Sequence, residues 1–379
     1  MPVLTVGLDG RFLQDKFHGI GRYLHGLVAA LAELEAMRVV LFVDPTVPNL
    51  RFPLQDLRLA SALEFQECRI PMYSPSELWR WPAMVSRQKI DVFHSPYFWS
   101  PLTLSCPLVS TVHDMIFDRY PEFVPGSPLR PIYRVASRLM LRRSAAVVTG
   151  SRASADDIVG IGRVPAGRVN VIPYGVEAKF NPRVPGEEVA RVRVGYGLPA
   201  RYVLAVGARR PHKNVRRLVE AFGRVMDDVE QSLVLVGSID RRIADDAEPA
   251  LHALRHTGRV LELDHVEEAD LPAVYAGADL LVQPSIIEGF GLPVLEAMAC
   301  GCPVAAARAP GVSEVAADAT EMFDPLVTEQ IADAILRVLG SAQRGRQLAQ
   351  LGLARAASFT WPNAARMTLE LYQRVVGSG

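Results

Sequence analysis

The sequence has few cysteines and no long apolar run, and both absences limit where the protein is expected to work. Its 379 residues include four cysteines, none of which forms a C-x-x-C pair or has zinc-ligand spacing. Four cysteines in so long a chain do not make a disulfide framework, which favours a reducing cytoplasm. No stretch of about 18 uncharged apolar residues occurs, so no membrane-spanning helix is expected. The first residues resemble a strand and not a signal peptide.

An excess of charge of either sign is also absent. Lys and Arg together number 41, as do Asp and Glu, so the formal net charge is zero. The whole chain is therefore not expected to attract nucleic acid. The sequence has no P-loop, no G-x-S-x-G and no H-E-x-x-H, and its glycine fingerprint for a dinucleotide is incomplete. That last absence disfavours an NAD-dependent oxidoreductase.

Short apolar runs alternate with amphipathic stretches along the chain. Several runs are continuous in Val, Leu and Ala, as in strands buried on both faces of a parallel sheet. The rhythm of strand–helix–strand units, repeated twice, predicts an α/β protein with two domains. The expected strands span residues 3–8, 39–43, 91–94, 108–113 and 145–149, then 202–206, 233–236, 260–263, 280–283 and 304–307.

Proline and glycine are dense between residues 173 and 199, where they mark a linker or hinge. We expect an N-terminal domain at residues 1–182, a C-terminal domain at residues 183–360 and a final helix at residues 361–379. The length of the chain suits two domains of this size.

The strongest functional pattern is PSIIEGFGLPVLEAMACG at residues 284–301, which follows an apolar strand and leads into a helix. Gly289 and Gly291 let backbone amides approach a ligand closely. The free amides and the dipole of the helix that begins near Pro293 suit a diphosphate. Glu288 and Glu296 are placed to accept hydrogen bonds from hydroxyl groups. The alternative is a unit packed only for stability, and the length of the pattern favours a ligand site.

A second pattern, VGARRPHKN at residues 206–214, puts a glycine turn and three cations after another buried strand. Arg209, Arg210 and Lys213 would lie at the carboxyl edge of a parallel sheet, where they could neutralise a pyrophosphate. Asn214 is a candidate N-cap of the next helix. A solvated basic loop is the alternative, and the glutamate pattern favours a binding role.

Two weaker patterns lie in the first half of the chain. HGIGRY at residues 18–23 is either a tight loop whose glycines bring backbone close to a ligand or a simple helix start. His113 follows an apolar strand at the edge where α/β sheets place ligands, although a histidine there is often only a polar cap on the core.

Four arginines recur at a helical spacing, namely Arg130, Arg134, Arg138 and Arg142. They share one helix face, which predicts either a solvated surface or a contact with acidic lipid or with an acceptor phosphate.

Together these patterns resemble the large retaining glycosyltransferase family 4, also called glycosyl transferases group 1. EGFGLPVLEAMACG at residues 288–301 is the most specific match, and VGARRPHKN, GIGRY, HD at 113–114, LPAVYAGAD at 271–279 and FTW at 359–361 match in order. The resemblance covers the whole chain and is closest to bacterial polysaccharide mannosyltransferases. It implies the GT-B fold: two Rossmann-like domains with parallel sheets that face each other across a cleft. The N-terminal domain would bind the acceptor and the C-terminal domain the nucleotide-sugar donor.

The resemblance also implies roles for individual residues. Lys213, with Arg209 or Arg210, would bind the diphosphate of the donor, and Glu296 would bind the ribose. The donor sugar would be held by Glu288 and by the backbone of Gly289, Phe290, Gly291 and Leu292. In the first domain, His113 would contact this sugar near the reacting carbon, and Gly19 and Gly21 would line the cleft. Backbone near His265 and Val266 would meet the nucleobase. The residues expected to take part in catalysis are His113, Lys213 and Glu288.

Ala208 departs from the family pattern, because many members carry arginine directly after the glycine of V-G. The guanidinium must come from Arg209 or Arg210, and the sequence leaves both open.

The sequence has no D-x-D pair, on which metal-dependent glycosyltransferases with a single nucleotide-binding domain rely. No metal ion and no cofactor are therefore expected, and cations and helix amides would stabilise the leaving diphosphate.

The stretch HDMIF at residues 113–117, with RYPE at 119–122, resembles bacterial mannosyltransferases of polysaccharide synthesis. This resemblance favours GDP-mannose over UDP-glucose, UDP-N-acetylglucosamine or a deoxysugar nucleotide as donor. The acceptor would be a saccharide or a lipid-linked molecule. Peripheral contact with the inner face of the cell membrane is a further expectation. A non-catalytic protein that binds sugar nucleotides is the remaining rival.

Overall fold

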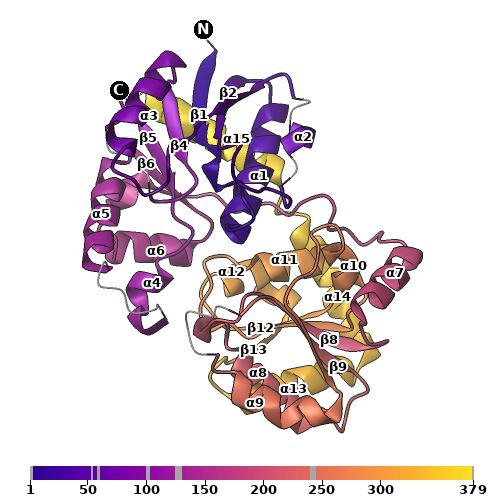
Figure 1. Cartoon of the computed structure of the whole chain (residues 1–379). Coiled ribbons are helices and arrows are strands. Elements are labelled where there is room, and N and C mark those ends of the chain that lie inside the picture. The colour runs from indigo at the N-terminus through magenta and orange to yellow at the C-terminus, as the bar shows by residue number, and fades with distance from the viewer. Residues whose placement is uncertain are drawn as a thin grey trace. The chain divides into compact units, whose positions relative to one another are not determined.

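Two sheets of parallel strands form the cores of two units of the chain (Figure 1). The computed structural model describes residues 3–52, 54–57, 60–99, 103–123, 130–239 and 245–377. Unit 1 consists of the described residues within Met1–Arg119, Gly126–Gly175 and Thr360–Gly379. Unit 2 consists of those within Tyr120–Pro125 and Val176–Phe359.

Unit 1 has a seven-stranded sheet in the order β3-β2-β1-β4-β5-β6-β7. The central strands are almost fully buried, including polar residues such as His94 and Ser110, because helices cover both faces of the sheet. All pairs are parallel, with Leu8 of β1 opposite Leu41 of β2 on one side and His94 of β4 on the other. The strands are β1 (Leu4–Asp9), β2 (Met37–Val43), β3 (Leu63–Glu67), β4 (Val92–Ser95), β5 (Leu108–Thr111), β6 (Ala146–Thr149) and β7 (Val169–Val171).

Most of the described helices of this unit lie between consecutive strands, as strand–helix–strand crossovers require, and α15 follows unit 2. They are η1 (Gly10–Phe12), α1 (His18–Glu33), α2 (Leu54–Leu57), α3 (Glu77–Arg87), α4 (Ile116–Arg119), α5 (Arg130–Arg143), α6 (Arg152–Gly160), η3 (Ala166–Arg168) and α15 (Trp361–Gly377).

The last helix, α15, belongs to unit 1 although it follows unit 2 in the sequence, and Figure 1 shows it in yellow among the indigo elements. It packs against α1, where Gly26 leaves room for the indole of Trp361. A Cβ atom at position 26 would lie only 2.2 Å from that ring. The sequence therefore fixes this contact with a glycine on one helix and a large aromatic residue on the other.

A buried chain of hydrogen bonds also joins α15 to the sheet. The Tyr372 hydroxyl lies 2.6 Å from His94 Nδ1, and His94 Nε2 lies 2.8 Å from Thr111 Oγ1. Thr111 Oγ1 in turn lies 2.8 Å from the Tyr23 hydroxyl. Burial, followed by the nearby charge of His113, lowers the pKa of His94 to about 3, so the ring is neutral at pH 7.

Unit 2 repeats the same architecture with six parallel strands in the order β10-β9-β8-β11-β12-β13. This is the strand order of a doubly wound sheet. From the central pair β8 and β11 the order runs outward in opposite directions, so the order reverses between these two neighbouring strands, while all strands stay parallel. The strands are β8 (Tyr202–Val206), β9 (Ser232–Val236), β10 (Val260–Leu263), β11 (Leu280–Gln283), β12 (Val304–Ala307) and β13 (Glu321–Phe323).

The described helices of unit 2 cover both faces of this sheet. They are η2 (Pro121–Phe123), α7 (Gly186–Tyr196), η4 (Pro211–Lys213), α8 (Val215–Val225), α9 (Glu248–Leu254), η5 (Arg255–Thr257), α10 (Leu271–Ala276), α11 (Leu292–Ala299), α12 (Val312–Ala316), η6 (Ala317–Ala319), α13 (Thr328–Leu339) and α14 (Ala342–Ala356).

All ten strands expected from the sequence are present, with ends that differ by at most two residues. Three strands were missed, namely β3, β7 and β13, which are short and lie at sheet edges. The predicted fold class is confirmed: both units are α/β domains built on parallel sheets.

Candidate functional site

Two loops of unit 2 meet at the carboxyl edge of its sheet, where the strand order reverses. One follows β8 and the other follows β11, and these strands are neighbours. Such a reversal point leaves a crevice outside the carboxyl ends of the strands, and α/β proteins bind ligands there. The two strongest sequence patterns occupy these two loops.

Asn214 holds the two loops together. Its Nδ2 donates to the Pro284 carbonyl at 3.0 Å and to the Pro325 carbonyl at 2.7 Å. A backbone bond from the Ile286 amide to the His212 carbonyl, at 2.8 Å, joins the loops a second time. Asn214 does precede α8, but its side chain makes no capping bond. The prediction that Asn214 is the N-cap residue of this helix is confirmed, and its left-handed backbone, with φ of 58°, suits asparagine.

An ion pair links the side chains of the two loops. Lys213 Nζ lies 2.6 Å from Glu288 Oε1. Gln283 Nε2 and Ser285 Oγ each donate to the same oxygen at 2.8 Å. The structure therefore brings together two of the residues expected to be catalytic, and it adds two donors that the sequence analysis missed.

This network keeps Glu288 ionised. Burial alone would raise its pKa, but the Lys213 ammonium and the hydrogen bonds from Lys213 and Ser285 outweigh burial, so the pKa lies below its ordinary value. Burial, helped by the charge of Lys213, lowers the pKa of the neighbouring His212 to about 4. At pH 7 the carboxyl group of Glu288 is thus ionised and the imidazole of His212 is neutral.

Helix α11 begins directly after the Glu288 loop. Gly291 is its N-cap residue with φ of 103°, a backbone conformation that glycine adopts readily. Because Gly291 has no side chain, the N-cap residue itself makes no side-chain capping bond at this helix start. The first amides and the helix dipole therefore favour an anion near Gly291 and Leu292.

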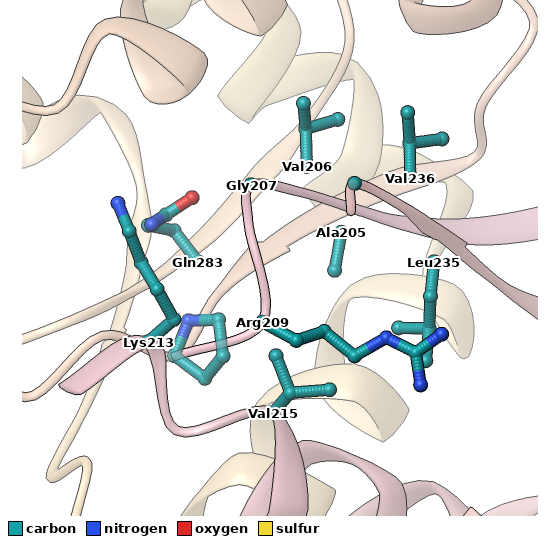
Figure 2. A pocket seen from close by; sticks show the side chains of 11 residues that line it. Ala205, Val206, Gly207, Arg209, Lys213, Val215, Leu235, Val236 and Gln283 are labelled. Atoms are coloured by element: carbon teal, nitrogen blue, oxygen red, sulfur yellow. The ribbon is translucent and has the colours of Figure 1, made fainter. Parts of the chain in front are cut away.

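A pocket lies where the ends of β8, β9 and β11 meet (Figure 2). In Figure 2, the side chains of Lys213 and Gln283 lie on one side of the turn at Gly207, and the guanidinium of Arg209 extends away on the other side, near Leu235. The pocket is lined by Ala205, Val206, Gly207, Arg209, Lys213, Val215, Leu235, Val236, Gly237, Gln283 and Pro284.

Arg209 is committed to two carboxylates of unit 2. Its Nη1 lies 3.2 Å from Asp245 Oδ2 and its Nη2 lies 2.7 Å from Glu262 Oε2. Only 5% of its side chain is exposed. These ion pairs tie the loop after β8 to β10, although Arg209 and Lys213 both line the pocket. Arg210 is partly exposed.

Glu296 and the pair at 265–266 lie elsewhere in unit 2. Glu296, expected to bind a ribose, is buried in α11, and its Oε2 accepts from the Tyr275 hydroxyl at 2.8 Å. His265 is exposed after β10 and lies 3.2 Å from Glu267 Oε1, whereas Val266 is buried. Phe290 is also buried, edge to face with Phe359 at 5.9 Å.

The remaining predicted residues, His113, Gly19 and Gly21, belong to unit 1. Both ring nitrogens of His113 are engaged there: Nδ1 lies 2.9 Å from the Tyr174 hydroxyl and Nε2 lies 3.0 Å from the Pro96 carbonyl. Burial lowers its pKa to about 4. Gly21 packs against the ring of Phe52, where a Cβ atom would lie 2.3 Å from a ring carbon, while Gly19 is open.

Among the described residues, no cluster of three or more His, Cys, Asp or Glu side chains is arranged to hold a metal ion.

Gly311 supports the Glu288 loop, which gives a test of its geometry. A Cβ atom at this position would lie 2.3 Å from the Glu288 carbonyl oxygen, and φ is 78°. Gly258 has a similar φ of 66° but open space around it. We expect Gly258→Ala to cost about 1–2 kcal/mol, the cost of left-handed backbone alone. Gly311→Ala should cost more, because the loop must also move. Urea unfolding followed by circular dichroism measures both, and equal losses would contradict the contact.

Comparison with known proteins agrees with this architecture. Residues 18–175 match the family described as "Glycosyl transferase 4-like domain", and residues 191–352 match "Glycosyl transferases group 1". The O-antigen chain mannosyltransferase B of Escherichia coli is 30% identical over 366 residues, which cover 94% of this chain and 96% of that protein. An MMP alpha-(1->4)-mannosyltransferase of Mycolicibacterium hassiacum is 30% identical over 286 residues, covering 71% and 66%.

Solved structures share the whole fold at low sequence identity. HepE of Anabaena, in complex with UDP, superposes with a TM-score of 0.73 at 20% identity, over 99% of this chain and all of that one. Sucrose-phosphate synthase of Thermosynechococcus elongatus gives a TM-score of 0.75 at 21% identity, with 99% and 100% coverage. From the family matches, the relatives and the two doubly wound sheets, we conclude that the chain belongs to the group 1 glycosyltransferases, family 4, and is a glycosyltransferase of the GT-B fold.

Proposed function

We propose that this glycosyltransferase moves mannose from GDP-mannose to a saccharide or lipid-linked acceptor, with retention of the anomeric configuration and without a metal ion. Unit 2 would bind the donor and unit 1 the acceptor. The mannose donor is supported by the relatives, which are named as mannosyltransferases. A UDP-sugar or a deoxysugar nucleotide is the alternative donor.

The observation that carries the proposal is the ion pair of Lys213 with Glu288 beside the uncapped start of α11. An ammonium has three donors, so Lys213 can turn from the carboxylate to a phosphate oxygen. Glu288 would then still accept hydrogen bonds from Gln283 and Ser285. It would be an acceptor for sugar hydroxyls, while Lys213 and the helix amides hold the diphosphate.

In the proposed reaction, the main catalytic effect is the stabilisation of negative charge on the leaving diphosphate. As the bond from the anomeric carbon to the phosphate oxygen breaks, negative charge grows on the diphosphate, and fixed positive groups lower the barrier by binding that charge. The acceptor oxygen would attack from the same face and give its proton to the departing phosphate oxygen. A product with inverted configuration, or a trapped glycosyl–enzyme adduct, would contradict this step.

We still propose that His113 contacts the donor sugar, but the hydrogen bonds of its ring limit how it can do so. Because Tyr174 and Pro96 already occupy both ring nitrogens, a contact through the ring requires one of these bonds to be displaced. We therefore assign the main catalytic effect to Lys213 and Glu288.

The direct test is turnover of GDP-mannose in the presence of EDTA, measured as release of GDP, with UDP-glucose as the competing donor. We expect turnover to persist in EDTA and to prefer GDP-mannose. Lys213→Met should lower the rate by about 100-fold or more, the usual loss when one fixed charge-stabilising donor is removed. Lys179→Met is the matched control, because Lys179 pairs with Glu177 and Glu268 on the surface. Turnover that requires added Mg²⁺, or none at all in the wild type, would overturn the proposal.

The diphosphate contact is assigned to Arg210, because Arg209 is held by Asp245 and Glu262. Arg210→Met should weaken GDP binding by about 10- to 100-fold, since a hydrogen bond to a charged group contributes about 1.5–3 kcal/mol. Arg209→Lys should instead lower the melting temperature with little change in GDP affinity. Calorimetric titration with GDP and thermal unfolding separate the two effects, with the exposed Arg216→Met as control. If Arg209→Lys weakened GDP binding and Arg210→Met lowered only the melting temperature, the diphosphate contact would belong to Arg209 and not to Arg210.

Peripheral membrane contact is proposed for α5. Among the helices of the described ranges, none is both long and apolar enough to cross a bilayer. Helix α5 exposes 58% of Val135 and 49% of Leu139 beside Arg138 and Arg142. Arg130, the first arginine of the predicted helix face, has a side chain outside the described part of the structure. An apolar strip between cations suits the surface of an anionic bilayer.

Sedimentation with vesicles tests this surface. The wild type should pellet with phosphatidylglycerol vesicles and not with phosphatidylcholine vesicles, and the double variant Val135→Ser, Leu139→Ser should pellet less. Val194→Ser, at an 83% exposed valine of α7, should behave as the wild type. Equal sedimentation of all three proteins would refute the contact.

A further inference from the structure

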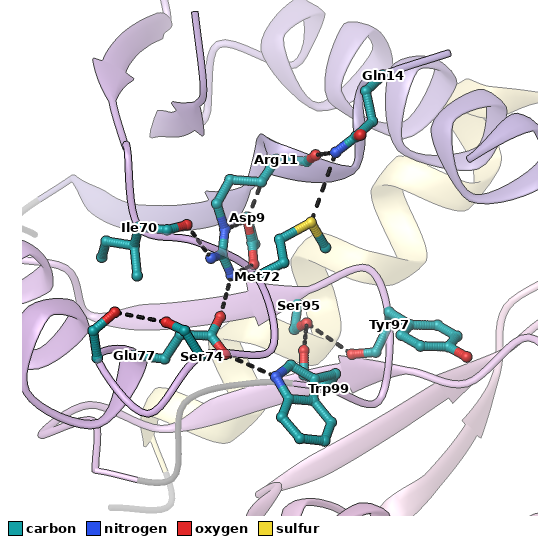
Figure 3. Close-up of polar contacts among 11 residues, drawn as sticks. Asp9, Arg11, Gln14, Ile70, Met72, Ser74, Glu77, Ser95, Tyr97 and Trp99 are labelled. Carbon is teal, nitrogen blue, oxygen red and sulfur yellow. Dashed lines mark hydrogen bonds and ion pairs between the residues drawn. The ribbon is translucent and has the colours of Figure 1, made fainter. Parts of the chain in front are cut away.

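The carboxyl edge of the unit 1 sheet carries a buried charged cluster that the reaction above does not use (Figure 3). Asp9 ends β1, and Arg11 follows it in η1. Arg11 binds Asp9 with two bonds, from Nε at 2.9 Å and from Nη2 at 2.7 Å. It also donates to the Ile70 carbonyl at 2.8 Å and to Glu77 Oε1 at 2.8 Å. All three charged side chains are almost completely buried.

The cluster fixes the orientation of a tryptophan. Glu77 uses its second oxygen, Oε2, to accept from the indole Nε1 of Trp99 at 2.8 Å. The backbone of the same loop, which follows β4, is held by Ser95, whose Oγ lies 2.7 Å from the Tyr97 carbonyl and 3.0 Å from that of Trp99. Figure 3 shows the chain of contacts from Asp9 through Arg11 and Glu77 to the indole.

The indole lies against a second aromatic ring that is open to solvent. Tyr73 packs edge to face on Trp99, with ring centres 5.2 Å apart, and 46% of Tyr73 is exposed. Its φ of 61° is left-handed, which is costly for an aromatic residue and persists only when the surroundings hold it. Trp99 itself is partly exposed.

A comparison with Trp81 shows that this arrangement is more than core packing. Trp81 is fully buried, lies under the Arg11 guanidinium at 4.8 Å and packs on Phe42 and Phe93. It completes the hydrophobic core. Trp99 instead has its polar edge tied to a buried carboxylate and part of its ring left at the surface. Burying two carboxylates with one guanidinium is a weak way to gain stability, but it holds a neighbouring group in one orientation.

We propose that the rings of Tyr73 and Trp99 form a stacking subsite for one pyranose ring of the acceptor saccharide. The subsite lies where doubly wound sheets bind ligands, beside the loops that follow β1 and β4 at the reversal of the strand order. The apolar face of a sugar stacks on aromatic rings, and rings anchored by a polar edge lose little freedom on binding. Arg11 and Glu77 are positioning residues.

A sugar ring is chosen as the ligand because of the chemistry of the surface that Tyr73 and Trp99 form. This choice rests on the proposed function in one respect only, namely that the acceptor is a saccharide. A partly exposed pair of rings offers a neutral, mainly apolar face, and the nearest ionic groups are already paired with each other. That surface suits a neutral sugar ring better than a phosphate. A relative that covers almost the whole chain is named for mannosyl transfer in an O-antigen chain, and that name points to a saccharide acceptor.

The experiment uses the full chain and three probes: α-linked mannotriose, cellotriose and chitotriose, titrated by calorimetry and then used as acceptors with GDP-mannose. We expect at least one trisaccharide to bind the wild type. Trp99→Ala should raise its dissociation constant and KM about tenfold, the range of one well-placed aromatic contact. Trp99→Phe should lose less, because the stacking ring remains.

Two further variants separate stacking from folding. Tyr73→Asn removes a ring without touching the buried carboxylate, and asparagine tolerates the left-handed backbone, so it should raise KM while leaving kcat and the melting temperature unchanged. Glu77→Gln should raise KM more than it lowers kcat, because the indole loses its charged anchor. Trp79→Ala is the matched control, since Trp79 is 62% exposed and lies two residues from Glu77, on the opposite side of α3.

GDP affinity and GDP-mannose hydrolysis, measured on the same variants, keep the two proposals distinguishable. Unchanged GDP affinity with a raised acceptor KM in Trp99→Ala and Tyr73→Asn supports the subsite. The subsite is overturned if no trisaccharide binds the wild type, or if both variants bind it as the wild type does. If trisaccharide binding depends on Trp99 but GDP-mannose is not turned over, the subsite stands and the proposed reaction fails.

Discussion

The ion pair between Lys213 and Glu288 is the interaction on which the proposed donor site depends. The two residues are 75 positions apart in the sequence, and they meet because β8 and β11 become neighbours where the strand order reverses. Each partner fixes the state of the other. Lys213 holds the carboxylate ionised in a place where burial would favour the neutral acid, and Glu288 holds the ammonium beside the start of α11. The proposed donor site thereby holds a paired ammonium and carboxylate before any ligand arrives.

The pair could not form without close contacts between the backbones of neighbouring loops. Gly311 lets the loop after β12 approach the Glu288 carbonyl, and Gly237 lets the loop after β9 approach the Gly207 carbonyl, which would lie 2.1 Å from a Cβ atom. Asn214 then joins three segments through its amide, which donates to the carbonyls of Pro284 and Pro325. Backbone shape therefore sets the side-chain chemistry here, because any side chain at these glycines would push the loops apart.

Unit 1 has the same order in its first six strands, but the cation at its reversal point is buried between two carboxylates. At the reversal point of its sheet the cation Arg11 is enclosed by Asp9 and Glu77, so its charge is fully used inside the protein. What remains at that edge is aromatic. One topology thus carries a partly exposed ammonium in unit 2 and partly exposed rings in unit 1, a division that fits the proposed charged donor and neutral acceptor.

The sequence by itself determined the strands that are apolar throughout, the two-domain rhythm and the two loops of unit 2, because these depend on residues close together in the chain. It did not reveal β3 (Leu63–Glu67), β7 or β13, whose short runs at sheet edges carry polar residues and gain their pairing only from a neighbouring strand. Only the tertiary structure decided that Arg209 binds Asp245 and Glu262 and that Gln283 and Ser285 support Glu288. It also decided that Tyr73 meets Trp99. Gln283 and Ser285 lie close to Glu288 in the sequence, but only the conformation of the loop turns them toward its carboxylate. The partners of Arg209 and Tyr73 lie on other loops or elements, and those contacts follow from the geometry of the sheet and not from local sequence.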